Sequence, residues 1–322
     1  MKNIIDKIKK EQIDSEGYQM ILIPKYKSFY LGIDSDDNTV FMIKPNDESQ
    51  QVTSVSSKGK YLDVLFDMKC QIKTNGQNIN DTFTILTLKT GNEFFIKIFL
   101  SVCNDLIKML GDYPDRLVIT NHIEVFRDLF GKALKKATIT EIGLWGELLV
   151  IETSSDVMFL IDCWHKLPKQ TFDFNDGVSK LEVKTTTLNE RIHSFSLNQL
   201  NKAKESSSLI CSIMTSQIDL GKSVSDLFES INSKLTTEYR LKFQNKLMDV
   251  AGSDLENFTN KFDYKSATLD MKMYEAKKIP SIDSSSIPSE ISGVKFKVIL
   301  EDLKSYEVDS NTPNLIKKIN HS

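Results

Sequence analysis

Short apolar and alternating runs dominate the N-terminal part of the chain. They predict strands at 18–23, 28–33, 39–43, 62–68 and 83–88. Ser35 to Asn38 is a polar run typical of a turn between two strands. Asn75-Gly76 is a second turn signal, although the expected connection is long for a tight hairpin. The alternation slips at Leu86, which indicates a bulge or burial on both faces there.

The period then changes to that of a helix. Apolar residues recur every three or four positions from Phe94 to Leu110, and Gly111 to Pro114 ends this segment. The patterns that follow predict helices within 120–154, a compact strand unit at 171–187, a helix at about 196–205, a strand at 208–214, a helical stretch at about 222–250 and a tail strand at 294–300. The Ser-rich segment 281–292 is expected to be a loop.

This order of elements predicts a mixed α/β fold. A chain of 322 residues is long for one compact domain. We therefore expect a β-rich N-terminal module at 1–115, a core at 116–220 and an α+β C-terminal module at 221–322.

Composition limits the classes of function. Hydrophobic residues make up 40% and charged residues 26% of the chain, which is typical of a globular protein. The 41 basic and 44 acidic residues give a net charge of −3, whereas proteins that bind DNA non-specifically have a basic excess. Any nucleic-acid site must therefore be local. Lys202 and Lys204 beside Lys180 and Lys184 are candidates for a basic stripe, with a solvated helix face as the alternative.

The cysteines and the N-terminus bear on location. Cys70, Cys103, Cys163 and Cys211 form no C-x-x-C pair, so we expect buried free thiols in a reducing compartment. Residues 1–7 are expected to form a short amphipathic helix without a secretory core. The longest apolar runs are too short to span a membrane. A soluble, cytoplasmic protein is the expectation.

Candidate chemistry lies in the strand unit, where Asn175-Asp176-Gly177 is a hairpin turn signal. The apolar residues that flank the turn alternate with polar ones; they are Phe172, Phe174, Leu181 and Val183. If these four face the core together, Asp173, Glu182 and Lys184 share the opposite face. This parity requires a loop of two or four residues, because a loop of three would turn Asp173 to the other side.

Two carboxylates and one ammonium on one patch suit a divalent-metal hydrolase. Asp173 and Glu182 would be oxygen ligands of Mg²⁺, for which Mn²⁺ would substitute, and the carbonyl of Val183 is a further candidate ligand. Lys184 would orient or activate the attacking water. The alternative is an exposed strand face with ordinary charges. Asp176 competes with Asp173 for the role of first carboxylate, but it lies in the turn.

The flanking motifs make the pattern more specific. They are Gly143-Leu144-Trp145-Gly146-Glu147-Leu148-Leu149, Trp164-His165, Asp173-Phe174, Glu182-Val183-Lys184-Thr185-Thr186, Arg191-Ile192-His193 and Gln199-Leu200. In this order, and with the tail around 287–296, they resemble a bacterial family of PD-(D/E)XK motif proteins. The resemblance covers about residues 136–301. One departure is Lys166-Leu167-Pro168, where the family usually has Gly-Pro after the Trp-His pair.

The resemblance implies a restriction-endonuclease-like core, with a central mixed sheet flanked by helices, and roles for further residues. Glu147 is placed as an extra acidic metal ligand, with helix packing as the alternative. Gln199 is either a catalytic helper or the second half of a capping box with Ser196. Arg191 and His193 would contact phosphate or be structural. Two further residues are favoured as packing residues, namely Trp145 in the core and His165 at a corner.

The expected function is that of a Mg²⁺-dependent endodeoxyribonuclease that cuts foreign double-stranded DNA in bacterial defence. Cutting both strands suggests a homodimer or a complex. Gly221-Lys222-Ser223 lacks the upstream glycine of an ATP-binding loop, so any ATPase or helicase-type activity would come from a partner. The alternatives are a catalytically idle DNA-binding or assembly subunit that serves such a partner, and an RNA-cleaving enzyme.

Overall fold

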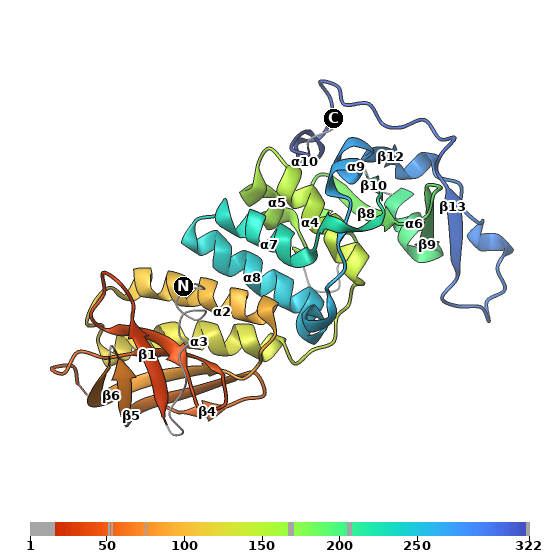
Figure 1. Cartoon of the computed structure of the whole chain (residues 1–322). Coiled ribbons are helices and arrows are strands. Elements are labelled where there is room, and N and C mark those ends of the chain that lie inside the picture. The colour runs from red at the N-terminus through yellow and green to blue at the C-terminus, as the bar shows by residue number, and fades with distance from the viewer. Residues whose placement is uncertain are drawn as a thin grey trace. The chain divides into compact units, whose positions relative to one another are not determined.

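The structure is a computed structural model and describes residues 17–50, 52, 54–74, 76–166, 171–204 and 208–319 (Figure 1). The helix expected at residues 1–7 lies outside this range. The mixed α/β fold with a strand-rich N-terminal part is confirmed. The chain divides into two compact units, one of residues 1–137 and 247–256 and one of residues 138–246 and 257–322. The division into three modules stays a prediction.

The first unit is built on a six-stranded sheet. Its strands are β1 (Tyr18–Leu22), β2 (Phe29–Ile33), β3 (Thr39–Ile43), β4 (Ser57–Lys58), β5 (Leu62–Thr74) and β6 (Gln77–Leu88). Their order is β1-β2-β3-β6-β5-β4, and β1 also pairs in parallel with β5, so the sheet curls back on itself. The curled sheet contains a cluster of buried side chains, namely Met20, Tyr30, Val40, Met42, Ile72, Phe83 and Ile85.

The β5–β6 hairpin is longer than its sequence pattern indicated. β5 ends at Thr74 and β6 begins at Gln77, and the ladder pairs these two residues, so the connection between the strands is short. Asn75 of the expected turn lies outside the described residues. The register shifts between Leu65 and Met68, next to Asp67 with its positive φ of 50°. The irregularity expected near Leu86 therefore belongs to the partner strand, and Leu86 itself lies in a segment of β6 that is fully buried.

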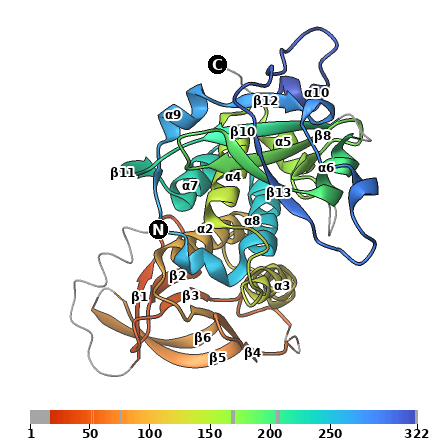
Figure 2. The ribbon, with the colours of Figure 1, turned by 90° about the vertical axis from the view of Figure 1, so that its right-hand side faces the viewer.

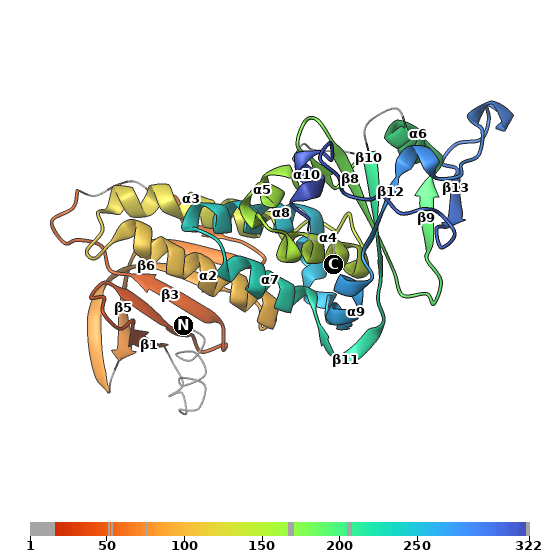
Figure 3. The same ribbon diagram turned by 90° about the horizontal axis from the view of Figure 1, so that it is seen from above.

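Helices α2 (Glu93–Leu110) and α3 (Arg116–Lys132) pack side by side over this sheet (Figure 3). The Asn92 side chain caps α2 by accepting hydrogen bonds from the first N–H groups of the helix. Aromatic rings join the layers: Tyr61 stacks on Phe95 with ring centroids 5.1 Å apart. The helix expected from the period at 94–110 is confirmed.

The second unit contains shorter elements. They are α4 (Glu141–Thr153), α5 (Val157–Cys163), β7 (Phe174–Asn175), β8 (Lys180–Thr186), β9 (Ile192–Ser196), α6 (Leu197–Lys204), β10 (Ser208–Met214), β11 (Gln217–Lys222), α7 (Val224–Ser233), α8 (Thr237–Ala251), α9 (Tyr264–Leu269), β12 (Lys272–Glu275), β13 (Lys295–Ile299) and α10 (Asn314–Lys317), with 3-10 turns at Gly252–Asn257, Ala276–Lys278 and Ser284–Ser286. The last turns of α8 belong to the first unit. The helical stretch expected at 222–250 is two helices, α7 and α8. The short elements α5, β9, β11 and β12 were not predicted, because they contain too few residues for a repeating pattern.

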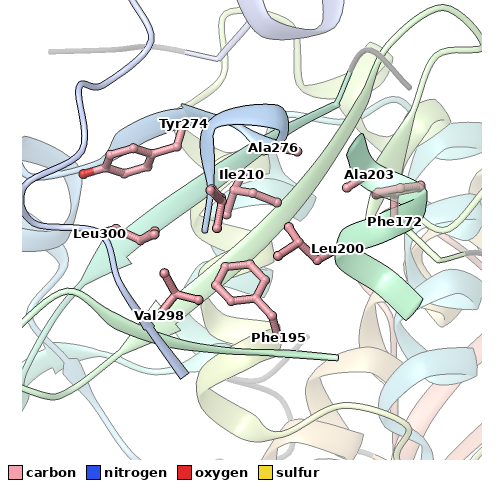
Figure 4. Packing of buried hydrophobic residues seen from close by; sticks show 10 residues of the cluster. Phe172, Phe195, Leu200, Ala203, Ile210, Tyr274, Ala276, Val298 and Leu300 are labelled. Carbon is pink, nitrogen blue, oxygen red and sulfur yellow. The ribbon is translucent and has the colours of Figure 1, made fainter. Parts of the chain in front are cut away.

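A four-stranded sheet in the order β12-β10-β8-β7 forms the centre of this unit (Figure 2). β8 and β10 run parallel, and the edge strands β7 and β12 are antiparallel to them. Helix α4 packs on one face, whereas α6 and the two-stranded ribbon β9–β13 cover the other (Figure 3). Figure 4 shows the core on this second face, where Phe195, Leu200 and Val298 gather around Ile210 of β10.

Three smaller expectations can be compared with the structure. Trp145 is fully buried, as expected of a core residue, and its indole N–H donates to the carbonyl of Lys222. All four cysteines are free; three are buried, but Cys70 is half-buried. In the described part of the chain, no helix has the length and apolar character needed to cross a membrane.

Candidate active site

The turn between β7 and β8 decides which way Asp173 faces. The ladder pairs Phe174 with Leu181, so the loop has four residues, one of the two lengths that the parity argument allowed. Continued by one position, this register sets Asp173 opposite Glu182. The Asp173 carboxylate is held against β8, because its Oδ2 accepts a hydrogen bond of 2.7 Å from the N–H of Val183.

Two details around the hairpin differ from the expectation or settle an alternative. Phe172 does not share a face with Phe174, because the chain bends at 171–173 before the strand starts. Phe172 instead belongs to the core around Ile210.

Asp176 lies in the turn, where its carboxylate accepts backbone hydrogen bonds of 2.7 and 2.9 Å from two loop residues. These bonds give Asp176 a local structural role.

Helix α4 brings Glu147 to the same end of the hairpin. The helix begins at Thr140, whose Oγ1 accepts a hydrogen bond from the N–H of Gly143. Gly146 allows the helix to approach β8 closely: a Cβ at this position would lie 1.9 Å from Oγ1 of Thr185. The next residue, Glu147, is only 3% exposed. The small residue therefore fixes the depth at which this carboxylate enters the site.

The Trp164-His165 pair holds Glu147. Oε2 of Glu147 accepts a hydrogen bond of 2.7 Å from the indole of Trp164 and lies 2.9 Å from Nε2 of His165. His165 has a left-handed backbone, with φ 39°, and its N–H donates to the carbonyl of Asp173 at 2.8 Å. Such a conformation is sparsely populated outside glycine and is often found at functional sites.

Glu147, His165 and Asp173 form a compact set of ligand atoms, all within 4.8 Å of one another. Our sequence interpretation favoured His165 as a packing corner and left it out of the metal site. The adjacency of Trp164 and His165 was the available signal, since two neighbouring ring nitrogens reach one carboxylate. Its meaning depended on α4, which is distant in sequence.

Glu182, Lys184 and Gln199 form a second group. Nζ of Lys184 lies 2.7 Å from Oε1 of Glu182 and donates to Oε1 of Gln199 at 3.3 Å. The Gln199 amide N–H₂ donates to the same Glu182 oxygen at 2.6 Å. The capping-box alternative is half realised: Ser196 caps α6 by accepting from the N–H of Gln199, while the Gln199 side chain turns into the site.

Crowded carboxyl groups make this site costly to ionise. Burial, with the charge of Glu182 in addition, raises the pKa of Glu147 to about 8. Burial and the charges of Glu147 and Glu182 raise the pKa of Asp173 well above its usual range. Burial also raises the pKa of Glu182, against the attraction of Lys184. The shifts of Glu147 and Asp173 are those expected of buried like charges that lack a sufficient counter-charge, whereas that of Glu182 comes from burial.

The residues fit a divalent cation. Oε2 of Glu182 is buried and has no hydrogen-bond partner among the described residues. A buried acceptor without a donor is destabilising, whereas a cation would satisfy it and favour the ionised form of all three carboxyls. Carboxylate oxygens suit Mg²⁺ and Mn²⁺, and an imidazole such as His165 adds a nitrogen donor of the kind transition metals prefer.

Arg191 and His193 are structural, which settles an alternative that the sequence left open. Arg191 is fully buried and donates to Ser212 and to the carboxylate of Asp270, 2.6 Å away. The His193 ring bonds the same Ser212 hydroxyl at 2.6 Å, and burial lowers its pKa to about 4. These side chains tie β9 to β10 and are not available to a phosphate.

The expected basic stripe is only partly assembled. Lys184 and Lys202 line one hollow together with Lys295 of the tail strand. Lys180 instead lies over the ring of Phe172, 5.2 Å from its centroid, and Lys204 donates to Ser281.

The fold and the site together define the class of protein. The sheet has a parallel pair of strands with an antiparallel hairpin at its edge, and it carries the carboxyls of Asp173 and Glu182 and the ammonium of Lys184. This is a nuclease-like α/β fold of the PD-(D/E)XK type. The particular family follows from a comparison of the whole chain. The family model described as "Putative PD-(D/E)XK family member, (DUF4420)" matches residues 2–301, so the protein belongs to this family. No curated protein and no solved structure matches the chain.

Proposed function

We propose that this protein is a Mg²⁺-dependent endodeoxyribonuclease that hydrolyses phosphodiester bonds of foreign double-stranded DNA. One observation carries the proposal: the carboxyls of Glu147, Asp173 and Glu182 gather at one end of the β7–β8 hairpin, next to the ammonium of Lys184. Membership of the PD-(D/E)XK family supports nuclease chemistry, since such proteins usually use divalent metals. The bacterial defence proteins that the motifs resemble support foreign DNA as the target.

The side chains divide into metal ligands and groups that act on the substrate. Asp173 and Glu182 would hold the cation, with Glu147, the carbonyl of Val183 and the neighbouring His165 as further donors. A bound Mg²⁺ or Mn²⁺ supplies Lewis-acid polarisation of the phosphate and a water of lowered pKa.

Lys184 orients the attacking water and offsets negative charge that develops on the phosphate. Gln199 keeps the Lys184 ammonium beside Glu182 through its two hydrogen bonds. Trp164 fixes the rotamer of Glu147 by donating to it. Each of these contacts holds a charged group at a defined place before substrate binds, which lowers the reorganisation needed during the reaction.

The direct test is cleavage of supercoiled plasmid by the purified protein with Mg²⁺, Mn²⁺ or EDTA. Lys184→Ala and Asp173→Ala should lose at least about 100-fold in rate, because the first removes the ammonium that offsets charge on the phosphate and the second removes a ligand of the cation. Lys304→Ala, an exposed lysine on the same unit, is the matched control and should cut like the wild type. Structured RNA offered beside the plasmid distinguishes a ribonuclease from a deoxyribonuclease.

The pattern of failure is informative. Loss of cutting with Mn²⁺ binding intact in calorimetry would point to a nuclease that needs a partner or modified DNA. No cutting together with no Asp173-dependent metal binding would overturn the proposal in favour of an idle assembly subunit. A duplex needs two active sites or two nicks, so we further propose a homodimer or a complex with an ATPase-type partner. Sedimentation of the purified protein with and without DNA tests the dimer.

A further inference from the structure

A hollow of about 440 Å³ opens beside the Lys184 end of the candidate active site. The described residues that line it come from the bend before β7, from β8, β9, α6 and β13. They are Thr171, Lys184, Ser194, Phe195, Ser196, Asn198, Gln199, Lys202 and Lys295. Three of these are lysines, five carry hydroxyl or amide groups, and none of them is acidic. The lining therefore offers hydrogen-bond donors and positive charge, and is suited to an anion.

The β9–β13 ribbon forms a wall whose two faces differ. Its antiparallel ladder pairs Lys295 with Ser196 and Phe296 with Phe195. Because side chains alternate along a strand, the lysine and the serine lie on one face and the rings on the other. Phe195 and Val298 are anchored in the core of Figure 4. The core thus fixes the register that presents Lys295 and Ser196 to the hollow.

Helix α6 contributes another part of the lining by the same principle. Leu200 and Ala203 pack into the core that Figure 4 shows. Asn198, Gln199 and Lys202 lie at the other positions of the helix and line the hollow. Three- and four-residue spacing puts these polar residues on one helical face. Segments separated by about a hundred residues in sequence therefore build one polar surface on a packed support.

The hollow is continuous with the candidate active site through two shared residues. Lys184 and Gln199 line it and also contact Glu182. The charge of Lys184 is offset by this carboxylate, so Lys295 supplies excess positive charge, and Lys202 lines the hollow as a further lysine. In the described part of the chain, Lys295 makes no ion pair, and its side chain is exposed. Since the whole chain has a net charge of −3, local charge of this kind is what attracts a polyanion.

We propose that this hollow binds the sugar-phosphate backbone of the DNA strand that is cut, next to the scissile phosphate. Cleavage of the bound strand rests on the proposed function, whereas binding of the backbone in the hollow does not. Lys295 and Lys202 contact backbone phosphate, and Ser194, Ser196 and Asn198 add hydrogen bonds that position the strand. Backbone contacts of this kind carry affinity without sequence preference.

The test is a fluorescence-anisotropy titration of a labelled DNA duplex in EDTA, where no cutting occurs, at several KCl concentrations. Lys295→Ala and Lys202→Ala should each weaken binding about threefold at intermediate salt and reduce the slope of log K against log salt by about 0.9. The double variant should show about twice the change in slope. Lys304→Ala should match the wild type, which separates the hollow from a general effect of net charge.

One further variant tests the position of the hollow. Lys297 lies on β13, on the same face as Lys295, but it is not among the described residues that line the hollow, so Lys297→Ala is the comparison. If it weakens binding as much as Lys295→Ala, the whole ribbon binds DNA and the assignment to the hollow is wrong. Circular dichroism spectra of all variants should coincide, because the side chains of Lys202, Lys295 and Lys297 are exposed.

Failure of this inference and failure of the proposed function give different results. Lysine-dependent binding without plasmid cleavage would leave the DNA-binding hollow standing and remove the nuclease. If Lys295→Ala and Lys202→Ala leave cleavage unaffected at subsaturating DNA, the hollow does not bind the DNA strand, but the nuclease activity stands. An unchanged salt slope in the double variant, or no DNA binding by the wild type at 50 mM KCl, also overturns it. Tighter binding of an RNA of the same sequence, with the same lysine dependence, would assign the hollow to RNA instead.

Discussion

At the scale of single residues, the candidate site is a balance between buried acids and few cations. Burial raises the pKa of Glu147, Asp173 and Glu182, and neighbouring carboxylates raise it further for Glu147 and Asp173. Lys184 is the ammonium in contact with Glu182. Gln199 stands between Glu182 and Lys184 and uses both ends of its amide. Its role is therefore positional: it orders two charged groups that would otherwise move independently.

Replacing Gln199 tests this positional role. Gln199→Ala should lower kcat for plasmid nicking about 10- to 100-fold with little change in KM, as expected for loss of a supporting hydrogen bond. Gln199→Glu keeps the length and one acceptor but loses the donor to Glu182, so it should rescue less than half of the loss on a logarithmic scale. A rise in KM with unchanged kcat would instead make Gln199 a substrate-binding residue.

Glu147 predicts a pH dependence of stability for the metal-free protein. Its pKa is about 8 in the folded state, against an ordinary value of 4.5 in the unfolded chain. Between these values the folded state binds more protons, so stability contributed by the neutral carboxyl is present at low pH and is lost as pH rises towards 8. Thermal unfolding in EDTA should thus show a Tm that falls from pH 5 to pH 8.5, and Glu147→Gln should flatten this fall.

A divalent cation should reverse the trend. Metal binding needs ionised carboxyls, so saturating Mn²⁺ should raise Tm more at pH 8 than at pH 6. A metal-induced rise that is equal at both pH values would mean that the ion binds elsewhere.

At the scale of elements, the approach of α4 to β8 sets the depth of Glu147. The close contact is between Gly146 and Thr185, whose Oγ1 is buried and has no hydrogen-bond partner among the described residues. The β7–β8 ladder pairs two residues of β7, and the ribbon β9–β13 pairs five and packs Phe195 and Val298 into the core. The second unit thus depends on helix-to-strand distances for the geometry of its site.

Gly146→Ala tests this contact. The added methyl would lie 1.9 Å from Thr185 Oγ1, so α4 must shift, with a loss of about 1–3 kcal/mol in the free energy of unfolding and reduced nicking. Gly131→Ala in α3 is the matched control, since a Cβ there meets nothing within 4 Å and should be neutral or stabilising. Urea unfolding measures both. Thr185→Ala should partly restore the Gly146→Ala variant, and equal losses at positions 131 and 146 would contradict the close-approach argument.

At the scale of the whole molecule, the two units are interleaved in sequence. Residues 247–256 follow the candidate active site along the chain but complete the first unit. Asp249 pairs with Lys132 at 2.8 Å, and Leu247, Met248 and Leu255 are buried. We therefore expect that the N-terminal residues do not fold as an independent domain, because part of the core of the first unit comes from the end of α8.

Dividing the chain at residue 137 tests this interleaving. The fragment 1–137 expressed alone should aggregate or unfold at a Tm lower by more than about 10 °C, because its apolar surface for 247–256 is left uncovered. Coexpression with 138–322 should give a soluble complex that copurifies on a single tag. A monomeric, stable 1–137 fragment would show that the segment 247–256 is dispensable.

Local sequence determined much of this protein. Periodicity and caps located α2, β1 to β3, β8 and α6, because these signals depend on neighbours within a few residues. The alternation of Glu182, Val183 and Lys184 set two charges on one face of β8, and the parity of the loop brought Asp173 to the same ladder.

Tertiary structure alone decided the rest. His165 reaches Glu147 only because α4 packs closely on β8, and Arg191 is buried only because Asp270 lies beside it. Lys295 joins Lys184 and Lys202 through the pairing of β13 with β9. Each of these contacts joins residues whose distance in space is set by core packing across many intervening residues, and no local period or spacing carries that distance.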